Sequence, residues 1–241
     1  MPNVREARTR KTKMYFENRE EFLRLLDLDL KMATKQAEKA GLIPCVRLNV
    51  ASDIAWEILH SEIFENHPKI QFYDYSKWTD HRFDQALASD TYKGRFAMPA
   101  NYHLTYSHNE NTPEGFTENL LAAGVNVAVV FDTEYSPSVS KVGKLPTSWR
   151  GFDVIDGDDH DIRLREFDNA QQSADDARGV VVGLRGKGGK RQVVAGVDSG
   201  FIMPTIGGVA EKHSFKVAGA RVEFGTIKAK VFLSRTINQL G

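Results

Sequence analysis

The chain has 241 residues and a mass of 27.0 kDa, and 41% of its residues are hydrophobic while 27% are charged. This composition is typical of a globular protein and excludes a disordered, collagen-like or coiled-coil chain. Its 32 basic residues balance its 32 acidic residues, so net charge gives no argument for a nucleic-acid partner.

The sequence also indicates whether the chain enters a membrane and what its cysteine can do. No apolar run reaches the roughly 18 to 20 residues needed to cross a bilayer, and the start of the chain lacks the apolar core of a secretory signal. We therefore expect a cytoplasmic protein with no membrane partner. The single cysteine, Cys45, cannot form an internal disulfide or ligate an iron–sulfur cluster by itself, so we expect no such cluster.

Capping residues and apolar spacing predict alternating helices and strands in the first half of the chain. Asn18 followed by Glu21 has the spacing of a capping box, which marks the start of a helix. Ser52 or Asp53 stands at the N-cap position of the next predicted helix, and capping explains an aspartate there without a catalytic role. We expect helices over residues 18–40, 52–66 and 112–124, and strands over residues 45–50, 70–75, 101–106 and 125–131.

The second half adds short strands over residues 152–155 and 179–184, with a brief helix over 169–178 between them. Successive strands begin about 25 to 30 residues apart, the length of a strand–helix unit, which predicts right-handed parallel crossovers. We expect an α/β domain over residues 1–192, built as a partial or open (β/α) barrel of about six mostly parallel strands. A flat doubly wound sheet is the alternative, but the sequence lacks a dinucleotide fingerprint. Residues 193–241 are small, glycine-rich and alternating, which predicts a β-rich C-terminal appendage.

Ionisable residues follow every predicted strand, and the carboxyl ends of parallel strands meet at one edge of a sheet. Ligands of α/β proteins bind at that edge, so the sequence predicts one functional rim. Its basic residues are candidate ligands for phosphate groups: Lys77, Arg185, Lys187 and Lys190. Its acids and its histidine are candidate catalytic residues, with no reaction specified: His108, Asp132, Asp156 and Asp158.

The segment from Asp156 to Asp161 is denser in carboxylates than loops usually are. Such carboxylates repel one another unless a cation or basic side chains compensate them. A divalent cation on Asp156 and Asp158 is one interpretation, because hard oxygen ligands suit magnesium, manganese or calcium. Compensation by Arg163, Arg165 or the basic loop of the sixth strand is the other, and we favour it because no local metal motif is present.

A glycine-rich basic loop, GLRGKGGKR at residues 183–191, would let main-chain N–H groups approach a phosphate while its cations neutralise the charge. It does not match the Walker pattern, because Gly189 stands where that motif needs a lysine. Most aromatic side chains beside the strands belong to the core, and a minority are candidates for stacking on nucleobases. The aromatic residues concerned are Tyr73, Tyr75, Trp78, Tyr102 and Tyr106.

Seven segments carry a family resemblance: VREARTRKTKMYFENREEFLRLL, RLNVASDIAWE, HPKIQFYDYSK, NYHLTYS, NVAVVF, VIDGDDHDIR and VVGLRGKG. In this order they resemble an uncharacterised family of phage- and plasmid-borne proteins, the actinophage gene-product-eighty-eight type. The resemblance implies a mobile-element origin and a fold distantly similar to radical-SAM partial barrels. Family members often begin with a Cys-rich segment, and with Cys45 alone this chain departs from that pattern, which puts cluster chemistry in doubt.

We interpret the chain as a phage or plasmid protein that binds nucleic acid or a host nucleoprotein complex through the strand-end rim, assisted by the basic N-terminal residues. Phosphate contacts of this kind give salt-dependent binding with little sequence preference. Two alternatives stay open. One is a protein-binding inhibitor of a host defence complex. The other is a phosphoryl-transfer enzyme that holds a divalent metal on Asp132, Asp156 and Asp158. Whether the chain is an enzyme, and its oligomeric state, are left open.

Overall fold

The computed structural model describes residues 2–50, 52–79, 82–83, 98–133, 143–170, 172 and 176–205. These residues divide into two compact units. Unit 1 holds the described residues up to Phe72 together with Pro99–Tyr102. Unit 2 holds the described residues of Tyr73–Met98 and those from His103 onward.

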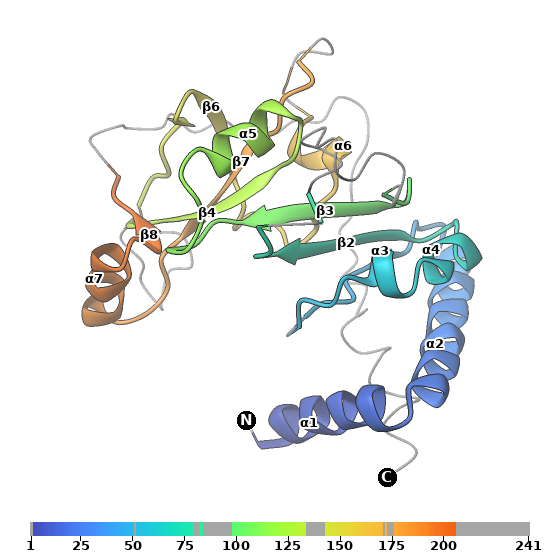
Figure 1. Cartoon of the computed structure of the whole chain (residues 1–241). Coiled ribbons are helices and arrows are strands. Elements are labelled where there is room, and N and C mark those ends of the chain that lie inside the picture. The colour runs from blue at the N-terminus through green and yellow to red at the C-terminus, as the bar shows by residue number, and fades with distance from the viewer. Residues whose placement is uncertain are drawn as a thin grey trace. The chain divides into compact units, whose positions relative to one another are not determined.

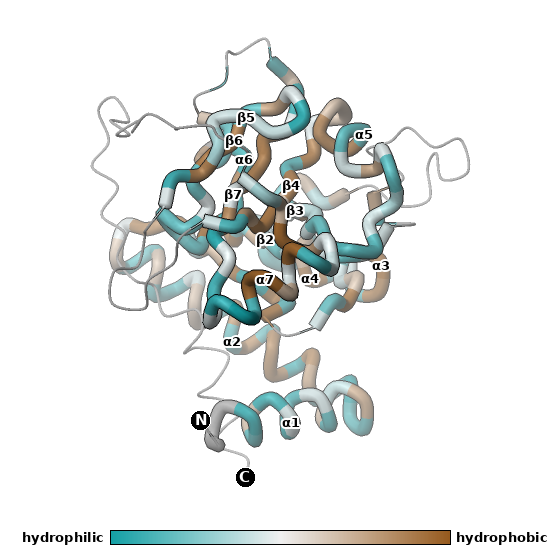
Figure 2. Tube along the Cα trace, turned by 90° about the vertical axis from the view of Figure 1, so that its left-hand side faces the viewer, coloured by the Kyte–Doolittle hydropathy of each residue, from teal (hydrophilic) through white to brown (hydrophobic). Residues whose placement is uncertain are grey.

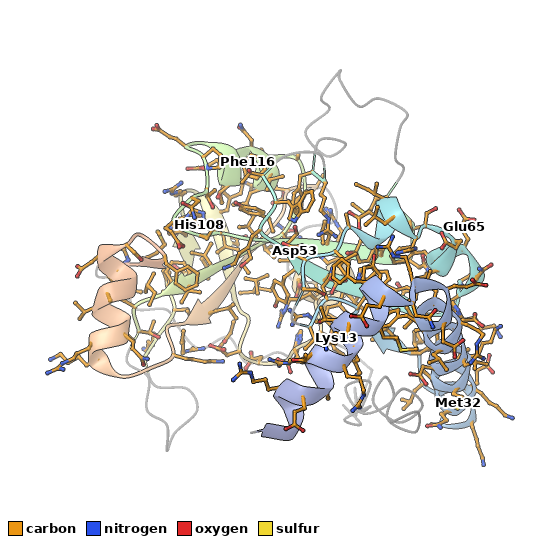
Figure 3. All side chains as sticks on the ribbon, turned by 60° about the horizontal axis from the view of Figure 1, so that its bottom comes forward. Lys13, Met32, Asp53, Glu65, His108 and Phe116 are labelled. Carbon is orange, nitrogen blue, oxygen red and sulfur yellow. The ribbon has the colours of Figure 1, made fainter. Side chains whose placement is uncertain are left out.

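Unit 1 begins with two helices, α1 (Pro2–Glu17) and α2 (Arg19–Lys39), which are separated by Asn18. Asn18 caps α2 as predicted, because its side-chain oxygen accepts a hydrogen bond of 3.4 Å from the main-chain N–H of Glu21. No apolar periodicity in the sequence predicts α1, whose polar side chains, Lys13 among them, project into solvent (Figure 3). Helix α2 is held by one buried apolar face: Phe22, Leu25, Leu26 and Leu30.

A buried asparagine organises the loop that precedes the next helix of unit 1. The side-chain oxygen of Asn49 accepts hydrogen bonds from the Ser52 hydroxyl (2.8 Å) and from the main-chain N–H of Ile54 (3.0 Å). It also accepts one from the indole N–H of Trp56, at 3.1 Å. Because the helix begins only at Trp56, the predicted N-cap at Ser52 or Asp53 is wrong. The remaining elements of unit 1 are β1 (Cys45–Val46), α3 (Trp56–Leu59) and α4 (Glu62–Asn66).

Strands β2 (Gln71–Ser76) and β3 (Tyr102–Ser107) begin in unit 1 and continue into unit 2. The short helix predicted over residues 169–178 lies earlier in the chain, over Arg165–Asp168. The other elements of unit 2 are α5 (Phe116–Ala122), β4 (Val127–Phe131), β5 (Ser148–Trp149), β6 (Phe152–Asp156), α6 (Arg165–Asp168), β7 (Val181–Arg185), α7 (Lys190–Asp198) and β8 (Ile202–Met203).

The strands form an open sheet in the order β1-β2-β3-β4-β7-β6-β5, and β8 also pairs with β4. Strand β4 pairs in parallel with β3, β7 and β8, and β6 pairs in parallel with β7, whereas β5 and β6 are antiparallel. Strand β8 joins β4 at Val130 and Phe131, beyond the position where Ser107 of β3 pairs with Ala128. The predicted α/β class with a mostly parallel sheet is confirmed, and the sheet is not closed into a barrel.

Strands β4 and β7 form the centre of the core of unit 2 (Figure 2). Both faces of these strands are covered, as their continuous apolar runs predict. Gly179, just before β7, lets the chain pass close to β4, because a Cβ at this position would overlap the main chain of Val125. The side chains with no exposed surface include Leu120 and Leu121 of α5 and Val127, Val129, Phe131, Val181 and Val182 of the strands.

Residues after 192 do not begin a separate appendage in the part of the chain that the structure describes. Helix α7 spans the predicted boundary, and β8 continues the parallel sheet. The two elements pack closely at Gly196, where a Cβ would lie 2.5 Å from Cδ1 of Ile202. The predicted appendage from residue 206 onward lies outside the described residues. None of the described helices is long and apolar enough to cross a membrane.

Candidate functional site

We call the last residues of β2, β3, β4, β6 and β7, together with the residues that follow them, the carboxyl edge of unit 2. The register places Phe131 of β4 beside Arg185 of β7, and Asp156 of β6 beside Gly183 of β7. Strands β2 and β3 run in one direction (Figure 1), and β3 is parallel to β4. The ends of these strands therefore lie along one edge of the sheet, whereas the residues after the first predicted strand, Ser52 and Asp53, belong to unit 1.

A buried arginine lies at the centre of the carboxyl edge. Both terminal nitrogens of Arg185 donate to the two oxygens of Asp156, at 2.8 and 3.0 Å, in the paired geometry that favours arginine over lysine. The Nε group donates to the carbonyl oxygen of Gly143 at 3.0 Å. Burial alone would lower the pKa of Arg185, but its bonds to Asp156 and Asp158 outweigh burial and raise that pKa. With its side chain 7% exposed, Arg185 is held inside the edge.

Asp158 extends this ion cluster toward the surface. Its Oδ2 accepts hydrogen bonds from the main-chain N–H of Arg185 at 3.0 Å and from the guanidinium of the same residue at 3.2 Å. Its Oδ1 lies 3.1 Å from Nζ of Lys187, whose side chain is 62% exposed. Two carboxylates thus face two cations, which is the compensation by the basic loop that the sequence suggested.

A second buried arginine shapes the acidic loop from within. Nη1 of Arg163 donates to Asp168 at 2.8 Å, and both side chains are almost completely buried. Nη2 donates to the carbonyl oxygens of Gly157 (2.8 Å) and His160. Arg163 therefore binds the main chain of the loop and an aspartate beyond it, rather than the loop carboxylates. Arg165 likewise donates to main-chain carbonyl oxygens.

Asp132 fastens the last described strand to the sheet. Its Oδ1 accepts hydrogen bonds from the main-chain N–H of Thr205 at 2.9 Å and from the hydroxyl of the same residue at 2.7 Å. Its main-chain N–H donates to the carbonyl oxygen of Met203 at 2.9 Å. The carboxylate of Asp132 is therefore engaged at the end of β8. Nothing in the sequence points to this contact, because the partners lie 73 residues apart.

His108, labelled in Figure 3, follows β3 and is packed into the fold. Its Nδ1 lies 2.9 Å from the hydroxyl oxygen of Thr117 in α5, and its ring meets Trp149 edge-on at 5.5 Å between centroids. Burial, with Arg150 nearby, lowers the pKa of His108 below its usual value. A buried neutral imidazole with these neighbours serves packing, and it is poorly placed to reach a substrate at the surface.

Exposed cations surround the start of α7. Lys190 and Arg191 occupy its first turn beside Lys187, and that turn holds no acidic residue. Cations at a helix N-terminus oppose the helix dipole, so this arrangement raises the positive potential of the loop. The main-chain N–H of Gly189 donates to Oε1 of Gln192 at 2.9 Å, which fixes the entry to the helix.

Lys77, which follows β2, lies close to the residues after the other end of α7. Its Nζ lies 5.2 Å from the ring centroid of Phe201, the residue that leads from α7 into β8. Trp78, which follows Lys77, keeps 41% of its surface exposed. The structure thus brings Asp156, Asp158, Arg185 and Lys187 together, and it connects Lys190 to Lys77 through α7 and Phe201. In the described residues no three His, Cys, Asp or Glu side chains form a group that could hold a metal ion.

The comparison with known protein families decides where the chain belongs. A family model described as gene product 88 matches residues 1–204. The chain belongs to the gene product 88 family. The match includes both units and the whole carboxyl edge up to Pro204, so the phage-type family expected from the sequence is confirmed. No curated protein and no solved structure matches this gene product 88 chain.

Proposed function

We propose that this gene product 88 protein binds the phosphate backbone of nucleic acid at the carboxyl edge of unit 2. The observation that supports this most directly is the group of exposed cations around the start of α7: Lys187, Lys190 and Arg191. Main-chain N–H groups and cations at a helix N-terminus attract anions. An anionic backbone would relieve the repulsion among these side chains.

Arg185, Asp156 and Asp158 form an ion cluster that holds Lys187 at the start of the basic loop. Arg185 joins β7 to the end of β6 through Asp156, and Asp158 holds both Arg185 and Lys187. The two aspartates and these two cations balance one another, so Lys190 and Arg191 add net positive charge outside the cluster. Arg185 is therefore a positioning residue, and the exposed Lys187, Lys190 and Arg191 are the residues that would contact phosphates.

Asp156 and Asp158 were also candidates for binding a divalent metal. In the structure their oxygens accept hydrogen bonds from Arg185, and a metal ion would have to compete for the same lone pairs. The observed pairing therefore favours the phosphate-binding function over a metal-dependent reaction at these residues.

The direct test is the affinity of the full chain for a fluorescently labelled oligonucleotide at low salt, measured by anisotropy for a single strand and for its duplex. We expect the Lys187→Ala/Lys190→Ala variant to bind roughly tenfold more weakly. The matched control is Lys35→Ala/Lys39→Ala, which removes the same charge from exposed positions of α2 in unit 1. Absence of binding by the wild-type chain, or an equal loss in both variants, would overturn the proposal.

A further inference from the structure

We infer that the nucleic acid bound at the carboxyl edge is single-stranded and that one of its bases stacks on Trp78. This inference rests on the proposed function and names its substrate. Trp78 is 41% exposed, so part of its ring surface is accessible to a base. The other two tryptophans differ: Trp56 is 3% exposed, and Trp149 has the guanidinium of Arg150 at 4.3 Å from its ring.

The local structure holds Trp78 in place at the edge. The main-chain N–H of Trp78 donates to the hydroxyl oxygen of Ser76 at 3.1 Å, which fixes the turn after β2. The preceding residue, Lys77, lies over Phe201, so this turn is joined to the end of α7. A main chain that is already fixed at Trp78 reduces the conformational freedom that is lost when a base stacks on its ring.

The cations lie at one end of α7, and the turn that carries Trp78 is joined to the other end. The lysines of the glycine-rich loop lie at the start of this helix, and Lys77, the residue before Trp78, lies over Phe201 just after its end. A nine-residue helix is ~13 Å long, a span that a few nucleotides of an extended strand cover. Phosphates would contact Lys187 and Lys190, and a base further along the strand would reach Trp78.

Stacking distinguishes the single strand from the duplex. In a duplex the faces of the bases are covered by neighbouring base pairs, and a surface ring meets only the backbone. In a single strand every base has an available face, and aromatic side chains bind it with little sequence preference. An exposed tryptophan in the turn that is joined to α7 therefore fits a single strand, whereas the cations of the glycine-rich loop alone would fit either form.

The experiment compares wild type, Trp78→Ala and Trp78→Phe with one labelled oligonucleotide, as a single strand and as a duplex. Trp78→Ala should weaken single-strand binding about tenfold and leave duplex binding unchanged, and Trp78→Phe should lie between. Binding of the single strand should also quench tryptophan fluorescence in the wild type and not in Trp78→Phe. Ile43→Ala, which truncates a side chain that is 70% exposed in unit 1, is the control and should change neither affinity.

The outcomes separate this inference from the proposed function. If Trp78→Ala binds the single strand as wild type does while the lysine variant binds weakly, stacking is wrong and phosphate binding stands. If Trp78→Ala weakens single-strand and duplex binding equally, selectivity for the single strand is wrong. If the wild-type chain binds neither form, both proposals fail.

Discussion

Arg185 and Asp156 form a paired ion contact, with two N–H groups facing two carboxylate oxygens at 2.8 and 3.0 Å. This contact joins the ends of two parallel strands, and Asp158 joins the same arginine to Lys187. The acidic loop after β6 and the basic loop after β7 are thus joined by ion pairs into one cluster. The shape of the proposed binding edge depends on that junction.

Asp156→Asn should destabilise unit 2, because it removes the paired carboxylate of the nearly buried Arg185 guanidinium and leaves Asp158, at 3.2 Å, as its charged partner. We expect the free energy of unfolding to fall by about 2 kcal/mol, the usual range for a hydrogen bond to a charged group. Urea denaturation measures this loss. Asp159→Asn, at an exposed position three residues away, is the control, and equal stability of the two variants would show that the paired contact contributes little.

Breaking the buried ion pair of Arg163 and Asp168 should lower the free energy of unfolding more than Asp156→Asn does. Arg163→Met leaves Asp168 as a buried charge, and such losses are about 3 to 5 kcal/mol. The double variant Arg163→Met/Asp168→Leu should recover part of this loss, since it removes both charges. A double variant that is no more stable than Arg163→Met would mean that the bonds of Arg163 to the acidic loop, and not the ion pair, hold this region together.

His103 should make the chain sensitive to acid. Burial, with Arg165 and Arg163 nearby, lowers the pKa of His103 from 6.5 to about 4. Between these values the unfolded chain binds a proton that the folded chain does not, so stability falls as the pH drops from 6.5 toward 4. The lowered pKa corresponds to about 3 kcal/mol over the full range.

Urea denaturation at neutral pH and at about pH 5 measures this dependence. The pH dependence of the unfolding free energy should be smaller in His103→Gln than in wild type. An unchanged dependence would assign acid sensitivity to the other histidines whose pKa burial lowers, which are His60, His67, His108 and His160.

Gly179→Ala should destabilise the chain, because the added methyl group would overlap the main chain of Val125, which cannot move away as a side chain can. Overpacking of this kind costs about 1 to 3 kcal/mol. Gly189→Ala is the matched control, since its Cβ would meet nothing closer than 3.9 Å. Thermal unfolding should separate the two variants, and equal midpoints would show that β7 can shift away from β4.

The parallel sheet was predictable because its central strands are apolar on both faces and recur at the spacing of strand–helix units. Once β4, β6 and β7 are parallel, their trailing residues must share an edge, so the sequence could place Asp156, Arg185 and Lys187 together. The same reasoning anticipated that the basic loop compensates the acidic loop.

The individual partners were not predictable. Arg163 contacts Asp168, and Asp132 contacts Thr205, because of the conformations of the loops that carry them. A sequence pattern does not predict those loop conformations. The N-cap expected at Asp53 is wrong for a related reason. The side-chain oxygen of Asn49 accepts hydrogen bonds from Ile54 and Trp56, and the helix begins only at Trp56. Helix α1 went unpredicted because its side chains form no apolar stripe.

The salt dependence of oligonucleotide binding is the sharpest test of phosphate binding at the carboxyl edge. Each phosphate contact to a single strand contributes about 0.7 to the slope of log affinity against log salt. We expect a clear negative slope for the wild-type chain and a slope shallower by about 1.4 for Lys187→Ala/Lys190→Ala. Identical slopes for the two proteins would contradict this expectation, because these lysines would then make no contact with the backbone.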